Sequence, residues 1–340
     1  MNILVIRFTS MGDVVCVTSL FAYLHEKFPD SKVYFLTDAK YAELFKDDPR
    51  IFQVIGQEKS RENDPVLQLI DVHWDKVIDL QNNKRSIRVR KMLLLGSASS
   101  AAVGIFKKNY PARMLLLFMR MNFYPPFDTV PRRYINAVAG FKQAPEEIPP
   151  LKVVLKADNY RAIYDSFFSN GVIRPVIALI PFSSWKNKEW PRRYFLYVGR
   201  YFLSKGWHVV ILGGPEDRSA ALELKKAIGR RCSALAGQIS LYQSACVLKR
   251  CSLALGNDTG LSHLARACGV KVGIIFGSTT FHFGFFPFAN PSYRVFQTEI
   301  FCRPCHPHGG NFCFLGARPC LKRIKPDTII RGLEELYLCT

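Results

Sequence analysis

Short apolar runs alternate with helical patterns along most of the chain, and this alternation limits the fold more than any other feature. Buried strands are predicted at 3–7, 32–37, 51–55, 74–80, 175–182, 207–214, 251–257 and 272–277. Helical spacing of apolar residues predicts helices that begin near Val14 and at 41–45, 192–206, 219–229 and 261–269. Strands and helices in this order are typical of right-handed β-α-β units, so parallel sheets are expected.

The alternation is interrupted once, which predicts a boundary between two domains. Three prolines fall between residues 143 and 154, and the strand pattern restarts after them. A chain of 340 residues is long enough for two separate cores. We therefore predict one parallel-sheet domain over residues 1–150 and a second over 151–340. The last helix of the chain either stays on the second domain or packs back on the first.

The net charge suggests an anionic partner. The chain has 47 Lys and Arg against 27 Asp and Glu, a formal charge of +20. Nucleic acid, an acidic membrane surface and a phosphorylated substrate would all suit this charge, and simple solubility is the alternative. Neither an aromatic RNA-binding pattern nor a helix-turn-helix signature is present, so nucleic acid is not expected.

Residues 84–125 mix basic residues with Leu and Met. This segment predicts amphipathic helices, which either lie on a membrane surface or pack in the core with basic outer faces. The sequence shows no secretory signal and no apolar run long enough to cross a bilayer. We therefore expect a cytoplasmic location.

Four loops at predicted strand ends carry the polar residues best suited to chemistry. They are "FTSMGD" (8–13), "PFSSWKNKEWP" (181–191), "GGPEDR" (213–218) and "GNDTGLSHLA" (256–265). Sites in parallel sheets lie at the carboxyl ends of the strands. The last loop enters a helix whose free N–H groups would suit a phosphate, although Asp258 or Thr259 could simply cap that helix. Taken singly, Lys188, His263 and Glu216 have equally ordinary structural explanations.

Together the loops resemble the ADP-heptose:lipopolysaccharide heptosyltransferases of glycosyltransferase family 9. The similarity rests on "R-F-T-S-M-G-D-V", "S-S-x-x-x-K-x-W-P" and "N-D-T-G-L-S-H-L-A…G…F-G-S-T", of which "D-T-G-L-S-H" is the most specific part. The chain has neither a G-x-G-x-x-G motif nor a Walker A motif, which argues against oxidoreductases and P-loop proteins. The resemblance implies the GT-B architecture, in which two Rossmann-like, doubly wound parallel-sheet domains face a cleft.

The resemblance also implies roles for individual residues. Asp13 matches the proposed general base, and Lys188 would meet the leaving diphosphate without a metal ion. The donor-binding residues would be Ser10, Met11, Gly12, Ser183, Ser184, Lys188, Glu216, Ile239, Asp258, Thr259, Gly260, Leu261 and His263. Basic candidates on the acceptor side are Arg7, Lys84, Arg85, Arg88 and Arg90.

The implied reaction is inverting transfer of heptose from ADP-heptose to the Kdo and heptose inner core of lipopolysaccharide. The enzyme would then work peripherally on the inner membrane of a Gram-negative bacterium, where the basic surplus would face acidic lipids. Leu261 and "TTFHFGFFP" stand where the family often has other residues, including proline. A different nucleotide-sugar or acceptor is therefore the main alternative, and a basic nucleic-acid-binding protein is a weaker one.

The C-terminal region contains a cysteine-rich stretch. Cys302, Cys305, Cys313 and Cys320 are spaced C-x2-C-x7-C-x6-C, as in the cysteine-rich tails of second-heptose enzymes. This spacing is compatible with a structural zinc site that has His306 and His308 as spare ligands, but free structural thiols or adventitious disulfides are the favoured alternative. The transfer reaction itself is expected to need no cofactor.

Overall fold

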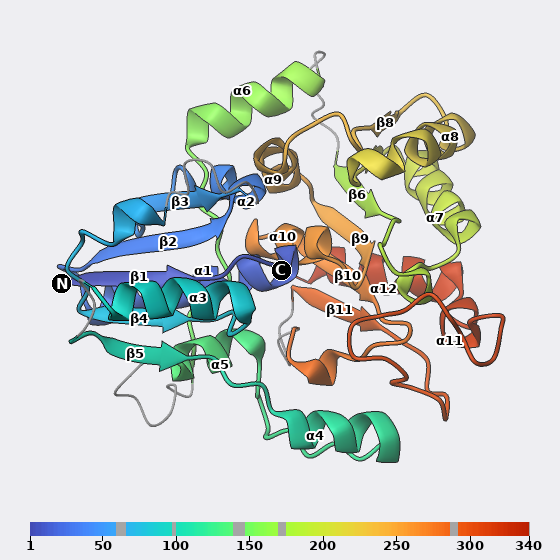
Figure 1. The fold of residues 1–340 in the computed structure, drawn as a ribbon. Coiled ribbons are helices and arrows are strands. Elements are labelled where there is room, and N and C mark those ends of the chain that lie inside the picture. Colours follow the sequence, from blue (N-terminus) through green and yellow to red (C-terminus); the bar gives the residue numbers. More distant parts are fainter. Residues whose placement is uncertain (59–65, 97–99, 139–146, 169–174, 286–291, 340) are drawn as a thin grey trace. The chain divides into compact units, whose positions relative to one another are not determined.

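The chain forms two compact units. A computed structural model describes residues 1–58, 66–96, 100–138, 147–168, 175–285 and 292–339 (Figure 1). The first unit contains Met1–Asn109 and Asp128–Leu155, and the second contains Tyr110–Phe127 and Lys156–Thr340. The sequence placed the division at residues 150 and 151. In the structure, residues 110–127 belong to the second unit and residues 151–155 to the first.

The first unit contains a five-stranded parallel sheet in the order β3-β2-β1-β4-β5. Its strands are β1 (Asn2–Ile6), β2 (Lys32–Asp38), β3 (Gln53–Gln57), β4 (Lys76–Asp79) and β5 (Ala102–Ile105). Its helices are α1 (Met11–Lys27), α2 (Ala39–Ala42), α3 (Lys84–Leu94) and α5 (Val130–Asn136), with 3-10 turns η1 (Glu43–Phe45) and η2 (Leu67–Leu69).

Alternate residues of these strands enter two different apolar layers. Leu4 and Ile6 of β1 join the layer that contains Val89 of α3, while Phe35 of β2 packs edge-on against Phe21 of α1. Both layers are buried, which explains why the strands read as continuous apolar runs instead of alternating ones.

The second unit contains a six-stranded parallel sheet in the order β11-β10-β9-β6-β7-β8. Its strands are β6 (Val176–Ile180), β7 (His208–Ile211), β8 (Cys232–Ala234), β9 (Leu253–Asn257), β10 (Lys271–Ile275) and β11 (Tyr293–Phe296). Its helices are α4 (Tyr110–Met114), α6 (Ala157–Phe167), α7 (Arg192–Ser204), α8 (Arg218–Ile228), α9 (Leu241–Lys249), α10 (Gly260–Ala267), α11 (Pro319–Lys322) and α12 (Pro326–Leu338). Single helical turns are η3 (Leu115–Met119, a π-turn), η4 (Lys186–Lys188), η5 (Pro215–Asp217) and η6 (Phe281–Phe283).

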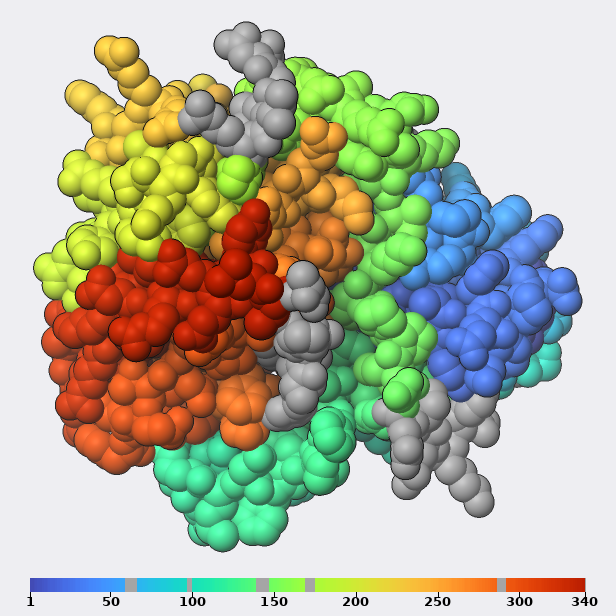
Figure 2. Space-filling model, turned by 180° about the vertical axis from the view of Figure 1, so that it is seen from behind, coloured from blue at the N-terminus to red at the C-terminus, as the bar shows by residue number. Residues whose placement is uncertain are grey.

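Helices cover both faces of this sheet. On one face, α7 and α8 pack on β6, β7 and β8, and α12 packs on β10 and β11 beside α7. On the other face, α10 packs on β9 and β10, with α9 beside it and α6 outside α9. In Figure 2 the red surface of α12 borders the yellow-green surface of α7, in agreement with their direct contact. These contacts hold the last long helix on the second unit.

Both sheets have the strand order of a doubly wound fold, and this order determines where each unit can bind a ligand. Counted within its own unit, the second sheet follows 3-2-1-4-5-6, and the first follows the same order without its sixth strand. The order reverses between β1 and β4 in the first unit and between β6 and β9 in the second. Loops at the carboxyl ends of these strand pairs form the expected ligand crevices.

The segment 84–125 is not the run of helices that its composition suggested. Helix α3 is present, but residues 102–105 form β5, which pairs in parallel with β4. The short run "AVGI" carries two β-branched residues and lies at a sheet edge, where strand pairing outweighs the helical pattern. None of the described helices has the length and apolar character required to span a bilayer.

Candidate functional site

In the first unit, Asp13 lies at the switch point between β1 and β4. It is in the first turn of α1, and its Oδ2 accepts hydrogen bonds from Ser10 Oγ at 2.7 Å and from the Ser10 backbone N–H at 3.3 Å. Its Oδ1 accepts a hydrogen bond from the Tyr134 hydroxyl at 3.1 Å. The Asp13 carboxylate therefore caps the N-terminus of α1 from within its first turn. Helix α1 begins at Met11, not near Val14 as the sequence pattern predicts.

A buried arginine lies behind this carboxylate. Arg7 Nη2 is 2.5 Å from Asp13 Oδ1, and Nη1 donates to the Leu80 carbonyl oxygen at the end of β4. Burial alone would raise the pKa of Asp13, but the Arg7 charge and the Ser10 hydrogen bonds bring it below its ordinary value. Asp13 keeps a partly exposed edge, with 16% of its side chain accessible. An ionised carboxylate at this position can accept a proton from a bound hydroxyl.

The five basic acceptor candidates fall into two groups. Arg7 is buried against Asp13, Arg85 pairs with Asp38 at 2.8 Å, and Arg90 pairs with Asp79 at 3.1 Å. The arginine side chains in this group are therefore held by carboxylates of the first unit. Lys84 and Arg88, both on α3, are exposed.

Asp258 has the corresponding position in the second unit, directly after β9. Its Oδ2 lies 2.7 Å from Lys188 Nζ and accepts a hydrogen bond from Thr279 Oγ1 at 2.7 Å. His263 Nε2 lies 3.5 Å from the other carboxylate oxygen. The Lys188 side chain is only 13% exposed, so the alternative that it is simply a solvated lysine on a loop is wrong.

The electrostatics of this cluster are dominated by one buried negative charge. Burial would raise the pKa of Asp258, but Lys188 and His263 lower it well below its ordinary value. Burial lowers the pKa of His263, and the Asp258 carboxylate opposes that effect only in part. At neutral pH the loop therefore contains an ionised Asp258, which is paired with Lys188, and a neutral His263.

The N-terminus of α10 is open beside this cluster. Thr259 occupies the N-cap position, but its hydroxyl makes no capping hydrogen bond, and the Asp258 carboxylate is engaged elsewhere. Thr259 Oγ1 and His263 Nδ1 are buried without a hydrogen-bond partner among the described residues. An uncapped helix start with unpaired polar atoms at a switch point can bind a phosphate. The alternative that Asp258 or Thr259 caps this helix is wrong.

Asparagines that the sequence analysis did not single out hold the loops in place. Asn257 accepts a hydrogen bond from the Trp190 backbone N–H at 3.0 Å and donates to the Pro181 carbonyl at 2.8 Å. The Asn187 backbone N–H donates to Gly310, and its carbonyl accepts from the Ser278 N–H. Thr279 was also missed, although it lies in the run "F-G-S-T". Tyr134 had no local signal at all, because nothing in "RRYIN" indicates a contact with Asp13.

The remaining predicted donor residues lie on three loops. Ser183, which accepts a hydrogen bond from the Trp185 N–H, and the exposed Ser184 follow β6. Glu216 is exposed on η5 after β7, and Ile239 is half-buried before α9. The Gly237 N–H donates to the Gly213 carbonyl at 3.3 Å, so the last two loops are in contact. Ser10, Met11 and Gly12 belong to the first unit.

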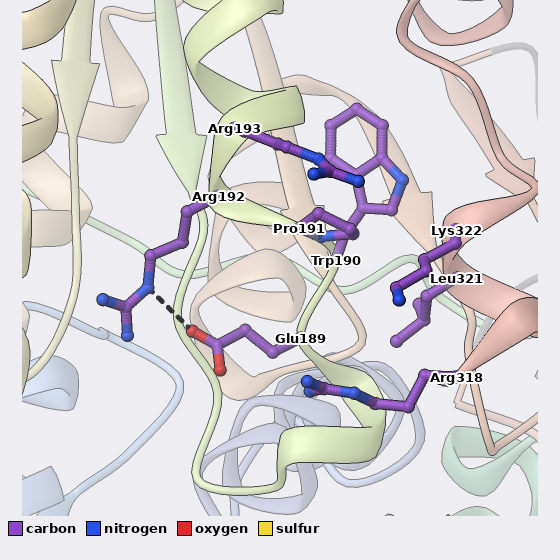
Figure 3. Close-up of a pocket in the computed structure, with 8 residues that line it drawn as sticks. All are labelled: Glu189, Trp190, Pro191, Arg192, Arg193, Arg318, Leu321 and Lys322. Atoms are coloured by element: carbon purple, nitrogen blue, oxygen red, sulfur yellow. Dashed lines mark hydrogen bonds and ion pairs between the residues drawn. The ribbon is translucent and has the colours of Figure 1, made fainter. Parts of the chain in front are cut away.

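A separate pocket follows Lys188 along the chain. It has a volume of about 430 Å³ and is lined by Glu189, Trp190, Pro191, Arg192, Arg193, Arg318, Leu321 and Lys322 (Figure 3). Arg192 Nε donates to Glu189 Oε1 at 3.1 Å. None of the predicted donor residues lines this pocket, so it is not part of the candidate site.

The cysteine-rich stretch lies close to the donor loops. The Cys305 backbone N–H donates to the Ser278 carbonyl at 3.0 Å, and Cys302, Cys305, Cys313 and Cys320 are all free thiols. The pKa of Cys320 is raised to about 11, chiefly by burial and further by the other three cysteines. Across the described residues, no three Cys, His, Asp or Glu side chains are arranged to hold a metal ion. The zinc site stays a prediction.

Comparisons with known proteins identify the family of the chain. The sequence model of glycosyltransferase family 9 (heptosyltransferase) matches residues 67–310, more than half of the chain. Lipopolysaccharide heptosyltransferase 2 of Salmonella typhimurium is 23% identical over 302 residues, which cover 82% of this chain and 84% of the relative. Lipooligosaccharide heptosyltransferase 2 of Campylobacter jejuni serotype O:2 is 22% identical over 337 residues, which cover 96% of each chain.

Solved structures show the same fold. The structure of Escherichia coli ADP-heptose lipopolysaccharide heptosyltransferase II is similar with a TM-score of 0.78 at 21% identity, covering 99% of each chain. The structure of E. coli heptosyltransferase WaaC with ADP is similar with a TM-score of 0.71 at 16% identity, covering 99% of this chain and 100% of that one. The two parallel sheets thus form a GT-B fold. The chain belongs to glycosyltransferase family 9 and is a heptosyltransferase enzyme.

Proposed function

We propose that this enzyme transfers heptose with inversion from ADP-heptose to the Kdo and heptose inner core of lipopolysaccharide. The names of its relatives support this reaction, since the Salmonella and E. coli proteins are lipopolysaccharide heptosyltransferases. Structures of WaaC with ADP and with ADP-2-deoxy-2-fluoro heptose support the choice of nucleotide. The proposed place of action is the cytoplasmic face of the inner membrane of a Gram-negative bacterium.

The open N-terminus of α10 is the observation that carries the proposal. When the bond between the anomeric carbon and the phosphate oxygen breaks, its electron pair stays on ADP and negative charge grows there. Free N–H groups at the start of α10 and the nearby Lys188 would stabilise that charge without a metal ion. The Thr259 hydroxyl can donate a hydrogen bond to the diphosphate, and the unprotonated Nδ1 of neutral His263 can accept one from a sugar hydroxyl.

Asp13 is the proposed general base. The acceptor hydroxyl forms the new bond to the anomeric carbon and gives its proton to the Asp13 carboxylate as that bond forms. Because its pKa is lowered, Asp13 is fully ionised at neutral pH. Arg7 is assigned a positioning role in place of the predicted acceptor contact, because its side chain is buried behind Asp13. The exposed Lys84 and Arg88 remain the proposed acceptor contacts.

Nucleotide binding tests the donor half of the proposal. ADP should raise the melting temperature by linkage, and UDP, GDP and an oligonucleotide should do so much less. The Lys188→Met variant should lose most of the ADP effect and Thr259→Val a smaller part of it, while Lys226→Gln, a matched change of an exposed lysine on α8, should keep it. Stabilisation by UDP or GDP in preference to ADP would contradict the proposed donor.

Turnover tests the acceptor half. Release of ADP should require both ADP-heptose and an inner-core acceptor, and the product should have the inverted anomeric configuration. A second candidate is a family 9 enzyme that uses another nucleotide-sugar, which the half-buried Leu261 at the second position of α10 favours. Turnover of another nucleotide-sugar at a higher kcat/KM than ADP-heptose would establish this second candidate.

A further inference from the structure

Two segments far apart in the sequence expose large apolar side chains. Between residues 110 and 127, Met114, Phe118, Met119 and Met121 are exposed, with Phe118 at 75%. In the cysteine-rich stretch, Phe312 and Phe314 are exposed at 83% and 84%. The donor and base clusters do not use these side chains. Single exposed apolar residues are ordinary, but a dense group of them marks an interaction surface.

Polar contacts join the two segments into one surface. Arg113 Nη2 lies 2.7 Å from His308 Nε2, and Arg120 Nε donates to the Phe301 carbonyl at 3.2 Å. Phe301 is itself 75% exposed. We call residues 110–127 and 301–318 together the apolar-basic face.

The charge of this face is of one sign. Neither segment contains an Asp or a Glu, while Arg113, Arg120 and Arg318 supply positive charge. Arg303 is turned inward, where it donates to the Gly277 and Thr279 carbonyls. A soluble protein partner with an ordinary mixed surface would not require a face without any carboxylate. Apolar side chains interleaved with arginines suit a bilayer interface, where the apolar groups enter the acyl boundary and the arginines meet lipid phosphates.

We propose that the apolar-basic face docks the second unit on an anionic lipid surface. The bilayer replaces water around Phe118, Phe312 and Phe314, and lipid phosphates neutralise the flanking arginines. The proposal also gives a use to the basic middle segment and to the cysteine-rich stretch. It deepens the proposed function, because it says which surface brings the enzyme to a lipid-linked acceptor.

Vesicle binding in the absence of donor and acceptor tests the docking separately from the reaction. The full chain should co-sediment with vesicles of phosphatidylcholine and phosphatidylglycerol, and far less with phosphatidylcholine alone or at high salt. Phe118→Ser/Phe314→Ser, with one change in each segment, should weaken binding about tenfold or more. The matched control is Leu222→Ser/Leu338→Ser, which removes exposed leucines from α8 and α12 and should bind like the wild type.

Further measurements decide the result. The melting temperature and the ADP effect should be unchanged in Phe118→Ser/Phe314→Ser, since both side chains are exposed. Equal vesicle binding by this variant and the control, or no binding by the wild type, would overturn the proposal. A concentration-dependent dimer of the wild type that this variant abolishes would also overturn it, because the face would then cover a second copy. Vesicle binding without heptose transfer would leave the docking intact and refute the proposed function.

Discussion

The two units have similar ion pairs at the point where the strand order of each sheet reverses, but the helix that starts there differs between them. Each has a carboxylate paired with a cation where the strand order reverses, Asp13 with Arg7 in the first unit and Asp258 with Lys188 in the second. In the first unit the carboxylate accepts the Ser10 N–H and closes its helix start. In the second unit the carboxylate turns to Lys188 and Thr279, and the helix start stays open.

This difference separates two kinds of chemistry. A helix start with its own carboxylate in the first turn is a poor site for a phosphate, because the two negative charges repel. An open helix start beside a lysine favours a phosphate. The same topology therefore supports proton transfer in one unit and diphosphate binding in the other.

The largest expected effect is at Asp13. Asp13→Asn should lower turnover about 10²- to 10⁴-fold at saturating ADP-heptose, because the base is lost. ADP should still raise the melting temperature of the variant, since the open helix start is in the second unit. The variant should also be less stable than the wild type, because Arg7 keeps a buried charge without its partner.

The control for Asp13 is Tyr134→Phe, which removes one hydrogen bond and keeps the carboxylate. It should lose far less turnover than Asp13→Asn. The acidic limb of the wild-type pH profile should lie below the ordinary range of an aspartate, because the pKa of Asp13 is lowered. Near-normal turnover of Asp13→Asn on an authentic acceptor would rule out the proposed base.

The second effect concerns the pair in the second unit. Lys188→Met should weaken ADP binding about 10- to 150-fold, since a charge-assisted contact is lost. It should also reduce the free energy of unfolding by about 3–5 kcal/mol, because Asp258 becomes a buried unpaired charge. The double variant Lys188→Met/Asp258→Asn should recover most of this stability but not the ADP binding. If calorimetry showed that the double variant recovers both its stability and its ADP binding, Lys188 would serve only to neutralise the Asp258 charge.

The third effect is a pH dependence in the second unit. The pKa of His263 is lowered by burial, while in the unfolded chain it is about 6.5. The unfolded state therefore takes up more protons below that pH, so the stabilising contribution of neutral His263 is present above pH about 6.5 and falls as the pH drops. His263→Gln should show a shallower loss of stability between pH 7 and 5. An unchanged slope in denaturant titrations would mean that His263 does not titrate in this range.

The smallest effects come from the two helix starts themselves. Ser10→Ala should cost about 1 kcal/mol of stability, because it breaks the hydrogen bond that helps to close α1. Thr259→Val should cost no stability, because the Thr259 hydroxyl makes no hydrogen bond to any described residue, but should weaken ADP binding about 2- to 10-fold. If Thr259→Val reduced the stability and Ser10→Ala did not, the proposed difference between the two helix starts would be wrong.

Local pattern predicted the parts of the molecule that depend on one segment at a time. The strands at 3–7, 32–37 and 74–80 are present with ends shifted by at most a few residues, because burial on both sides leaves a continuous apolar run. The short strands β5, β8 and β11 were missed, since a few apolar residues at a sheet edge carry little periodic signal.

The sequence by itself determined the fold class and the four loops, since each depends on the burial and hydrogen bonding of a short stretch. Only the tertiary structure decided which side chains meet. Tyr134 reaches Asp13 across 121 residues, and Lys188 reaches Asp258 across 70. Those meetings depend on the strand order of each sheet and on the packing of its helices. The local sequence pattern does not predict such contacts, because a buried strand has the same apolar run at any position in a sheet.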